Sequence, residues 1–370
     1  MQEWKLKEDN MAVYTMKEAK SAPSTSKGLV FWLRENLFST IPNTLLTLLG
    51  FYFIYTTIPP LLDWMIFDAT WSGTKEEVVK EGARWIFIIE KFDQFMYGFY
   101  PESLHWRPNL VAVISLAFVF LVPRLKNIKV KLVIMLLFPF VCFVLISGGW
   151  FGLEVVGTEK WGGLMLTILV AAVGIIASFP IGILLALGRQ SDNMPIVKFL
   201  CIGFIEFIRG VPLITILFMA SVVLPLFFSD GIDFDKLLRA LIGITLFQAA
   251  YIAEVIRGGL QAIPKGQYEA SESLGLTYWQ GMILIILPQA LKISIPNLVG
   301  SFISLFKDTT LVLIIGLFDI LAMVTLTNSD TNWLGFEIEG YVFVTMIYWV
   351  FCFSMSQYSR VIERRYNTDH

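Results

Sequence analysis

The feature that most constrains this chain is a series of long apolar runs with few charged residues. Residues 162–188, for example, contain no Asp, Glu, Lys or Arg. About 20 consecutive apolar residues cross the hydrocarbon core of a bilayer as a helix. Over the 370 residues, 56% are hydrophobic and only 16% are charged, whereas soluble domains carry about a quarter charged residues. We therefore predict an all-α polytopic membrane protein.

Eight runs are long enough to be transmembrane helices. The predicted spans are 38–62, 108–123, 131–150, 162–188, 198–228, 237–257, 282–305 and 340–359. A further apolar piece, 311–324, is too short to cross alone and is expected to be a half-helix or part of a broken span. We expect two parts: an N-terminal extension (1–160) with three spans and a long extracytoplasmic loop, and a denser core (161–365) with five spans.

The basic residues of the short loops predict the orientation in the membrane, because cytoplasmic loops are enriched in Lys and Arg. With eight spans, the basic tail before Arg34, the loop 124–131 and the last turn around Arg364 fall on one side. Both termini are therefore predicted to be cytoplasmic. The opposite loops are more acidic, and the long loop 63–107 is interpreted as a small packed cap or a docking surface, in preference to a functional site.

Composition also excludes several classes of function. A formal net charge of -2 gives no basic surface for nucleic acid. The three cysteines lie in apolar runs, and the two histidines, His105 and His370, lie outside the spans, so no metal site is expected.

The stretch "QYEASESLGLTYWQGMILIILPQ" places polar residues between two apolar runs. Pro264, just before it, suits the first turn of a helix, and Gly275 is placed to follow the end of that helix. Thr277 and Gln280 form a capping box for the next helix, in which Pro288 predicts a kink. This pattern is typical either of a plain surface connection between two spans or of a docking helix for a cytoplasmic partner.

The same stretch resembles a known signature. "EASESLG", nine residues and then "IILP" match the EAA motif of bacterial ABC importer permeases, with Ser271 in place of an alanine. In that family the segment is the coupling helix, which sits in a groove of the ATPase subunit. The resemblance therefore implies that the coupling residues are Gln267, Tyr268, Glu269, Ala270, Ser271, Gly275 and Leu276.

Four further segments resemble the polar amino acid branch of this family, and the resemblance covers about 161–365. They are "IEFIRGVPL", "AAYIAEVIRGGLQAIPKGQYEA", "LPQALKISIP" and "FISLFKDTTL". Gly300 and Ser301 stand where the branch usually has an Asn–Gln pair, which puts ligand contacts there in doubt. The extension 1–160 resembles the longer permeases of broad-specificity amino acid importers.

The resemblance implies a type I importer core in a bacterial inner membrane and a set of partners. These are a second, homologous permease in a heterodimer, a cytoplasmic ATPase dimer that binds ATP and Mg, an extracytoplasmic substrate-binding protein, membrane lipid and an amino acid substrate. This chain has no G-x-x-x-x-G-K-[ST] phosphate loop, so it is expected to bind no cofactor and to be a non-catalytic subunit.

Lys307 and Asp308 are ionisable residues within an apolar region, where such residues are costly and mark candidate sites. "KDTT" predicts a helix break in which Asp308, Thr309 or Thr310 caps the following segment. Backbone N–H groups near the threonines are expected to meet a substrate carboxylate, and Asp308 the ammonium. Ser304 completes this predicted substrate site, and the alternative is a structural Lys307–Asp308 pair.

Two i,i+3 pairs lie near predicted cytoplasmic helix ends: Glu206 with Arg209, and Glu254 with Arg257. Such pairs are usually structural, and a latch between the two helices is the functional alternative.

Three other classes of protein remain to be weighed. An ion-coupled secondary transporter often shows internal repeats, and none is visible. An intramembrane enzyme needs a catalytic cluster inside the spans, where no histidine lies. A membrane scaffold leaves Lys307 and Asp308 unexplained.

Overall fold

The structure is a computed structural model that describes residues 28–72, 82–191, 193–227, 234–331 and 333–366. The N-terminal lysines, His370 and most of the acidic loop 229–235 lie outside these residues. Every regular element in the described ranges is a helix. The chain divides into two compact units: Met1–Thr70 with Val79–Ala83, and Trp71–Val78 with Arg84–His370.

The first unit contains α1 (Leu29–Asn36) and the long apolar helix α2 (Ile41–Leu62), which continues as a π-helix, Asp63–Phe67. Thr40 caps α2 by accepting a hydrogen bond from the backbone N–H of Asn43 at 3.3 Å. No side chain of these helices is buried. An apolar helix of this length, exposed on all sides, needs the bilayer or another helix around it.

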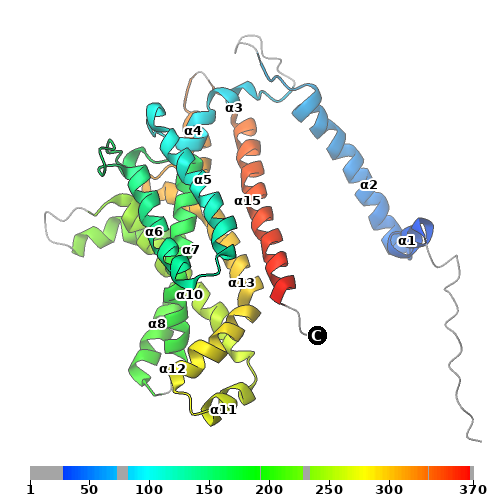
Figure 1. Cartoon of the computed structure of the whole chain (residues 1–370). Helices are drawn as coiled ribbons and strands as arrows, with labels where there is room; N and C mark the ends of the chain where they lie inside the picture. Colours follow the sequence, from blue (N-terminus) through cyan, green and yellow to red (C-terminus); the bar gives the residue numbers. More distant parts are fainter. Residues whose placement is uncertain (1–27, 73–81, 192, 228–233, 332, 367–370) are drawn as a thin grey trace, which may run out of the picture. The chain divides into compact units, whose positions relative to one another are not determined.

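The second unit holds the remaining helices (Figure 1). They are α3 (Ile86–Glu90), α4 (Phe92–Tyr97), α5 (Trp106–Leu121), α6 (Ile128–Ser147), α7 (Gly163–Arg189), α8 (Pro195–Gly210), α9 (Leu213–Phe218), α10 (Lys236–Gln261), α11 (Lys265–Ser273), α12 (Tyr278–Gly281), α13 (Leu287–Asp308), α14 (Ile320–Thr327) and α15 (Glu337–Tyr366). In this unit α3 and α4 lie at one end, and α11 and α12 lie at the opposite end (Figure 1).

The predicted number of spans is confirmed. The described part of the chain has seven helices long and apolar enough to cross a membrane, and eight if one bent pair counts as a single span. The bent pair corresponds to the predicted span 198–228, which is therefore a broken span. Pro195–Gly210 and Leu213–Phe227 meet at 106°.

The bend follows from the sequence "GVP". Proline clashes with a helical residue before it, so Val211 is extended, with φ -113° and ψ 136°. Pro212 itself has φ -60° and ψ 143°, and α9 begins at the next residue. The break therefore had a local signal that the apolar pattern concealed.

Helix α10 lies at the centre of the packing and contacts α7, α8, α9 and α13. Its buried residues include Ala240, Ala249, Ala250 and Ala253, all 0% exposed. Small side chains let helix backbones approach closely, which is how helices associate where lipid is as apolar as the side chains. The closely packed helices around α10 thus support α13 and the segments directly before and after it.

The described part of the loop 63–107 in the second unit is a packed cap. Phe87 and Phe95 are fully buried, and they pack in a cluster with Trp333 and Phe336. Arg84 Nε also pairs with the buried Glu339 at 3.0 Å. This part of the extension is therefore anchored on the loop before α15 and on the first turn of α15.

Candidate functional site

The polar insert folds as a short helix that ends at a glycine. Gly275 has φ +72°, a left-handed conformation that glycine adopts without strain. The N–H of Gly275 donates to the carbonyl of Glu272 at 2.9 Å, and the N–H of Leu276 donates to that of Ser271 at 3.3 Å. This pair of bonds is a Schellman motif, so the predicted end of the helix is confirmed. Pro264 is the residue just before α11 and does not lie within its first turn.

The predicted capping box is also confirmed. The N–H of Gln280 donates to Thr277 Oγ1 at 3.4 Å, and the N–H of Thr277 donates to Gln280 Oε1 at 3.0 Å. The helix then passes through a π-helix, Met282–Ile286, and α13 begins at Leu287. The interruption predicted at Pro288 is therefore a π segment followed directly by a new α-helix that carries the proline in its first turn.

The seven predicted coupling residues fall on two faces of this segment. Gln267, Glu269, Ala270 and Gly275 are exposed, Tyr268 and Leu276 are half-buried, and Ser271 is buried. Leu274, which the sequence interpretation missed, is 73% exposed and places a large apolar side chain among the open residues. A single exposed apolar residue does not by itself mark a contact surface, but Leu274 is accessible to a partner of this segment.

Side-chain contacts hold α11 against its neighbours. The Tyr268 hydroxyl donates to the carbonyl of Leu260 at 3.2 Å, and Gln289 Nε2 donates to Gln267 Oε1 at 3.2 Å. Burial raises the pKa of Tyr268, which keeps its hydroxyl protonated as a donor. Ser271 packs on Gly281, where an added Cβ would lie 2.1 Å from Ser271 Oγ. Glycine at position 281 therefore allows this close contact with Ser271.

At the other end of α13 the predicted helix break is present, but the predicted capping is wrong. The helix ends at Asp308 and continues as a 3₁₀-helix, Thr309–Ile315, without a side-chain cap. The Thr309 hydroxyl donates backwards to the carbonyl of Phe306 at 2.8 Å, and that of Thr310 to the carbonyl of Lys307 at 3.0 Å. The last carbonyls of an α-helix lack intrahelical N–H partners, and here two of them accept hydrogen bonds from the threonine hydroxyls.

The predicted substrate residues differ in how open they are. Ser304 and Lys307 are exposed, Asp308 and Thr310 are half-buried, and Thr309 is 1% exposed. The backbone N–H of Thr309 already donates to the carbonyl of Leu305. The side chain of Thr309 is thus enclosed by protein, whereas the other four residues remain open.

Two polar residues near this break escaped the sequence interpretation. Gln248 of α10 is 3% exposed, and its Nε2 donates to Ser301 Oγ at 2.9 Å, at the position where the branch usually has its Asn–Gln pair. Asp319 is fully buried and caps α14 by accepting from the N–H of Ala322 at 2.9 Å. The sequence signal for Gln248 was a polar residue inside an apolar helix. The signal for Asp319 was an aspartate directly before a helix, where it can act as the N-cap.

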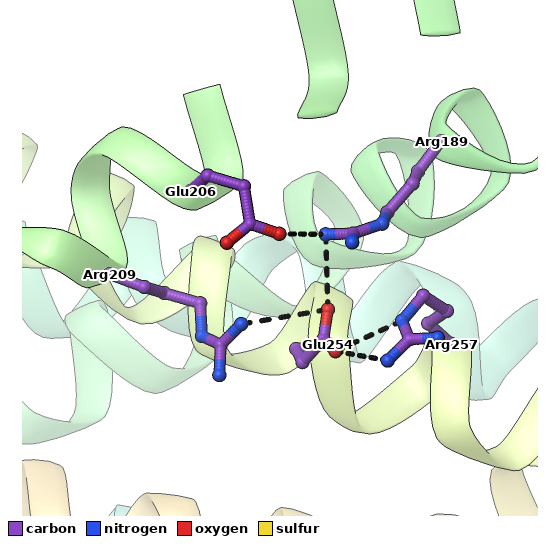
Figure 2. A network of polar contacts seen from close by, with 5 residues as sticks. All are labelled: Arg189, Glu206, Arg209, Glu254 and Arg257. Atoms are coloured by element: carbon purple, nitrogen blue, oxygen red, sulfur yellow. Dashed lines mark hydrogen bonds and ion pairs between the residues drawn. The ribbon is translucent and has the colours of Figure 1, made fainter. Parts of the chain in front are cut away.

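The charged residues of α7, α8 and α10 form one network, shown in Figure 2. Arg189 Nη1 lies 2.9 Å from Glu206 Oε1 and 3.2 Å from Glu254 Oε2. Glu254 Oε1 also accepts from Arg257 Nε at 3.0 Å, and Arg209 Nη1 lies 3.8 Å from Glu254 Oε2.

The predicted pairing within this network is half right. The Glu254–Arg257 pair is present, whereas Glu206 pairs with Arg189 of α7 in place of Arg209 of its own helix. All five side chains are between 20% and 55% exposed in the chain by itself. The structure thus brings the four predicted latch residues together around Arg189, and a latch function stays a prediction.

Apolar spanning helices joined by a structured polar helix and turn are compatible with the membrane component of a transporter. The family model described as "Binding-protein-dependent transport system inner membrane component" matches residues 178–368. The chain belongs to this family, and it is a multi-pass inner-membrane ABC transporter permease.

Two relatives match almost the whole chain. The inner membrane amino-acid ABC transporter permease protein YhdY of Escherichia coli (strain K12) is 53% identical over 356 residues, which are 94% of this chain and 96% of the relative. The glutamate/glutamine/aspartate/asparagine transport system permease protein BztC of Rhodobacter capsulatus is 40% identical over 423 residues, covering 95% of this chain and 96% of the relative.

A shorter relative matches only part of the chain. The probable glutamine ABC transporter permease protein GlnP of Bacillus subtilis is 33% identical and covers 55% of this chain but 92% of its own length. The long relatives therefore share nearly the full chain, and the short relative shares about half of it. The ion-coupled alternative is not favoured.

Proposed function

We propose that this chain is a permease subunit of an ATP-driven importer of polar amino acids, with α11 as its coupling helix. The observation that carries the proposal is the geometry of residues 265–281. A Schellman turn ends α11 and a capping box begins α12, while Glu269, Ala270 and Leu274 stay exposed. A rigid helix with an open face transmits a movement of a bound partner to the helix that follows it, here α13.

The proposed partners follow from the family. They are a second permease that completes the path, an ATPase dimer that docks on α11, and a substrate-binding protein on the opposite side of the membrane. The ATPase dimer is the partner that binds ATP and Mg. The names of the full-length relatives support an amino acid as the substrate, and one of them specifies glutamate, glutamine, aspartate and asparagine. In this proposal the core 161–365 forms the path and the extension 1–160 is an addition to it.

We place the substrate path along the open side chains at the end of α13. Asp308 faces the substrate ammonium, and Ser304, Lys307 and Thr310 lie beside it. Because Thr309 is enclosed, its contribution to this site is indirect. The network around Glu254 connects α7, α8 and α10 and is the proposed latch between these helices.

The coupling proposal is tested in the complex reconstituted with its second permease, its ATPase and a panel of amino-acid-loaded binding proteins. Glu269→Arg is expected to abolish stimulation of ATP hydrolysis and co-purification of the ATPase. The matched control is Glu337→Arg, the same substitution at an exposed position at the opposite end of the second unit. Retention of full ATPase binding and stimulation by Glu269→Arg overturns the proposal.

The orientation proposal, with both termini cytoplasmic, has a separate test. Ser273→Cys in α11 is expected to react with a membrane-impermeant maleimide only in inverted vesicles. Glu337→Cys at the start of α15 is expected to react only from the outside. The reverse pattern of labelling contradicts the orientation.

A further inference from the structure

A buried carboxylate lies immediately beyond the helix break. Asp319 is 0% exposed, and its oxygens accept from the N–H of Ala322 at 2.9 Å, the N–H of Leu321 at 3.3 Å and the hydroxyl of Tyr348 at 3.3 Å. No ion pair to Asp319 occurs among the residues that the structure describes. Burying a carboxylate is costly unless hydrogen bonds compensate, so its partners here have a defined geometric role.

A line of polar contacts continues from Asp319 towards the proposed substrate site. The hydroxyl of Tyr348, in α15, lies 3.4 Å from Thr309 Oγ1, which itself donates to the carbonyl of Phe306. The ring of Tyr348 also packs edge-on against Phe306, with centroids 5.2 Å apart. Tyr348 therefore contacts the residues on both sides of Lys307 and Asp308.

A third helix holds the other end of this line of polar contacts. The N–H of Ile320 donates to Thr167 Oγ1 of α7 at 3.1 Å, and the N–H of Gly163 donates to the carbonyl of Phe318 at 2.9 Å. Residues on both sides of Asp319 are thus tied to the start of α7. Because these two N–H···O bonds hold the backbone on both sides of Asp319, the carboxylate is an anchor from which Tyr348 reaches the end of α13.

We propose that Asp319, Tyr348 and Thr309 are positioning residues for transport, which orient Asp308 towards the substrate through the last turn of α13. This inference rests on the proposed function of Asp308. None of the three residues contacts the substrate in this proposal. Apolar packing by itself leaves the last turn of a helix free to rotate slightly, whereas side chains locked by further hydrogen bonds hold a site in its productive geometry.

The test measures the number of amino acid molecules taken up per ATP hydrolysed by the reconstituted complex. This ratio does not change when a variant lowers only the amount of folded protein, because uptake and hydrolysis then fall together. Tyr348→Phe keeps the ring and removes only the hydroxyl. We expect it to lower the ratio about two- to tenfold, the range of a single hydrogen bond.

Two further comparisons examine the same line of polar contacts. Thr309→Val is expected to lower the ratio, and Thr309→Ser, which keeps the hydroxyl, to preserve it. The control is Thr327→Val, which removes a buried hydroxyl of α14 that donates to the carbonyl of Met323, outside this line of polar contacts. The control is expected to leave the ratio unchanged even if it lowers the melting temperature of the complex.

The double variant Asp308→Asn/Tyr348→Phe separates this inference from the proposed function. If Tyr348 acts through Asp308, the double variant has the same ratio as Asp308→Asn by itself. A reduced ratio for Asp308→Asn with an unchanged ratio for Tyr348→Phe overturns the positioning role and leaves the substrate site standing. If the double variant lowers the ratio by the product of the two single reductions, the positioning role is also overturned. If Asp308→Asn leaves the ratio unchanged, both the positioning role and the proposed substrate site are overturned.

Discussion

The two ends of α13 are built from different kinds of interaction. Before it, the turn at Gly275 and the capping box at Thr277 close through bonds between residues three to five positions apart. After it, Asp319 bonds to Tyr348 29 residues away, Thr309 lies against Tyr348 39 residues away, and Ile320 bonds to Thr167 153 residues away. The first end is specified locally, and the second end depends on the whole packed core.

This difference matches what each end does in the proposed transporter. The coupling end is exposed, and it must present a stable surface to a separate protein. The substrate end combines open side chains with the enclosed Thr309 and Asp319, and neighbouring helices must hold it while the path changes around it. Damage at the first end should therefore impair contact with the ATPase, whereas damage at the second end should impair stability and coupling.

The largest effect is expected from Asp319→Leu. Removing the carboxylate leaves the N–H groups of Leu321 and Ala322 and the hydroxyl of Tyr348 without this acceptor. Each buried group left unsatisfied costs about 1–3 kcal/mol, so a loss of about 3 kcal/mol or more is expected. The melting temperature of the purified complex measures it, and a change no larger than that of Thr327→Val contradicts a central role for Asp319.

Gly275→Val is expected to have the next largest effect. The left-handed conformation costs a non-glycine residue about 1–2 kcal/mol, and a β-branched side chain suffers most. Distortion of the turn should reduce ATPase binding and leave the thermal stability of the spanning core nearly unchanged. Gly266→Val, in the helical part of α11, is the matched control. Equal loss of ATPase binding in both variants would show that the turn has no special role.

Thr277→Ala should weaken the start of α12 by about 1 kcal/mol, as expected for the loss of an N-cap side chain. Thr277→Ser should retain most of the stability, because its hydroxyl can accept from the N–H of Gln280. ATPase stimulation measured at rising temperature provides the comparison. The same loss in both variants would indicate that the side-chain methyl group, and not the cap, is important.

The smallest effect is expected from Arg189→Gln. This change removes the contacts of Arg189 with Glu206 and Glu254, but the side chains are partly exposed and Arg257 still pairs with Glu254. Partly exposed ion pairs contribute about 0–1 kcal/mol and weaken as salt rises. The melting temperature should therefore fall slightly at low salt and less at high salt. A large loss of transport at unchanged stability would instead support the latch.

Local signals explain most of what was predictable. The eight spans follow from apolar length, and the helix–turn–helix of residues 265–281 follows from a proline, a glycine and a capping box close together. The bend at Val211 had a local signal too, but the long apolar run 198–228 concealed it. By contrast, nothing near Glu206 indicates that it pairs with Arg189, because that contact depends on how α7 and α8 pack.

The sequence by itself determined the number of spans, the helix–turn–helix of residues 265–281 and the family, because each depends on apolar length or on residues at short fixed spacing. Only the tertiary structure decided that the threonines of "KDTT" donate backwards, that Thr309 is enclosed and that Asp319 meets Tyr348. The physical reason is that a buried polar group takes whichever partner the packed helices bring to it.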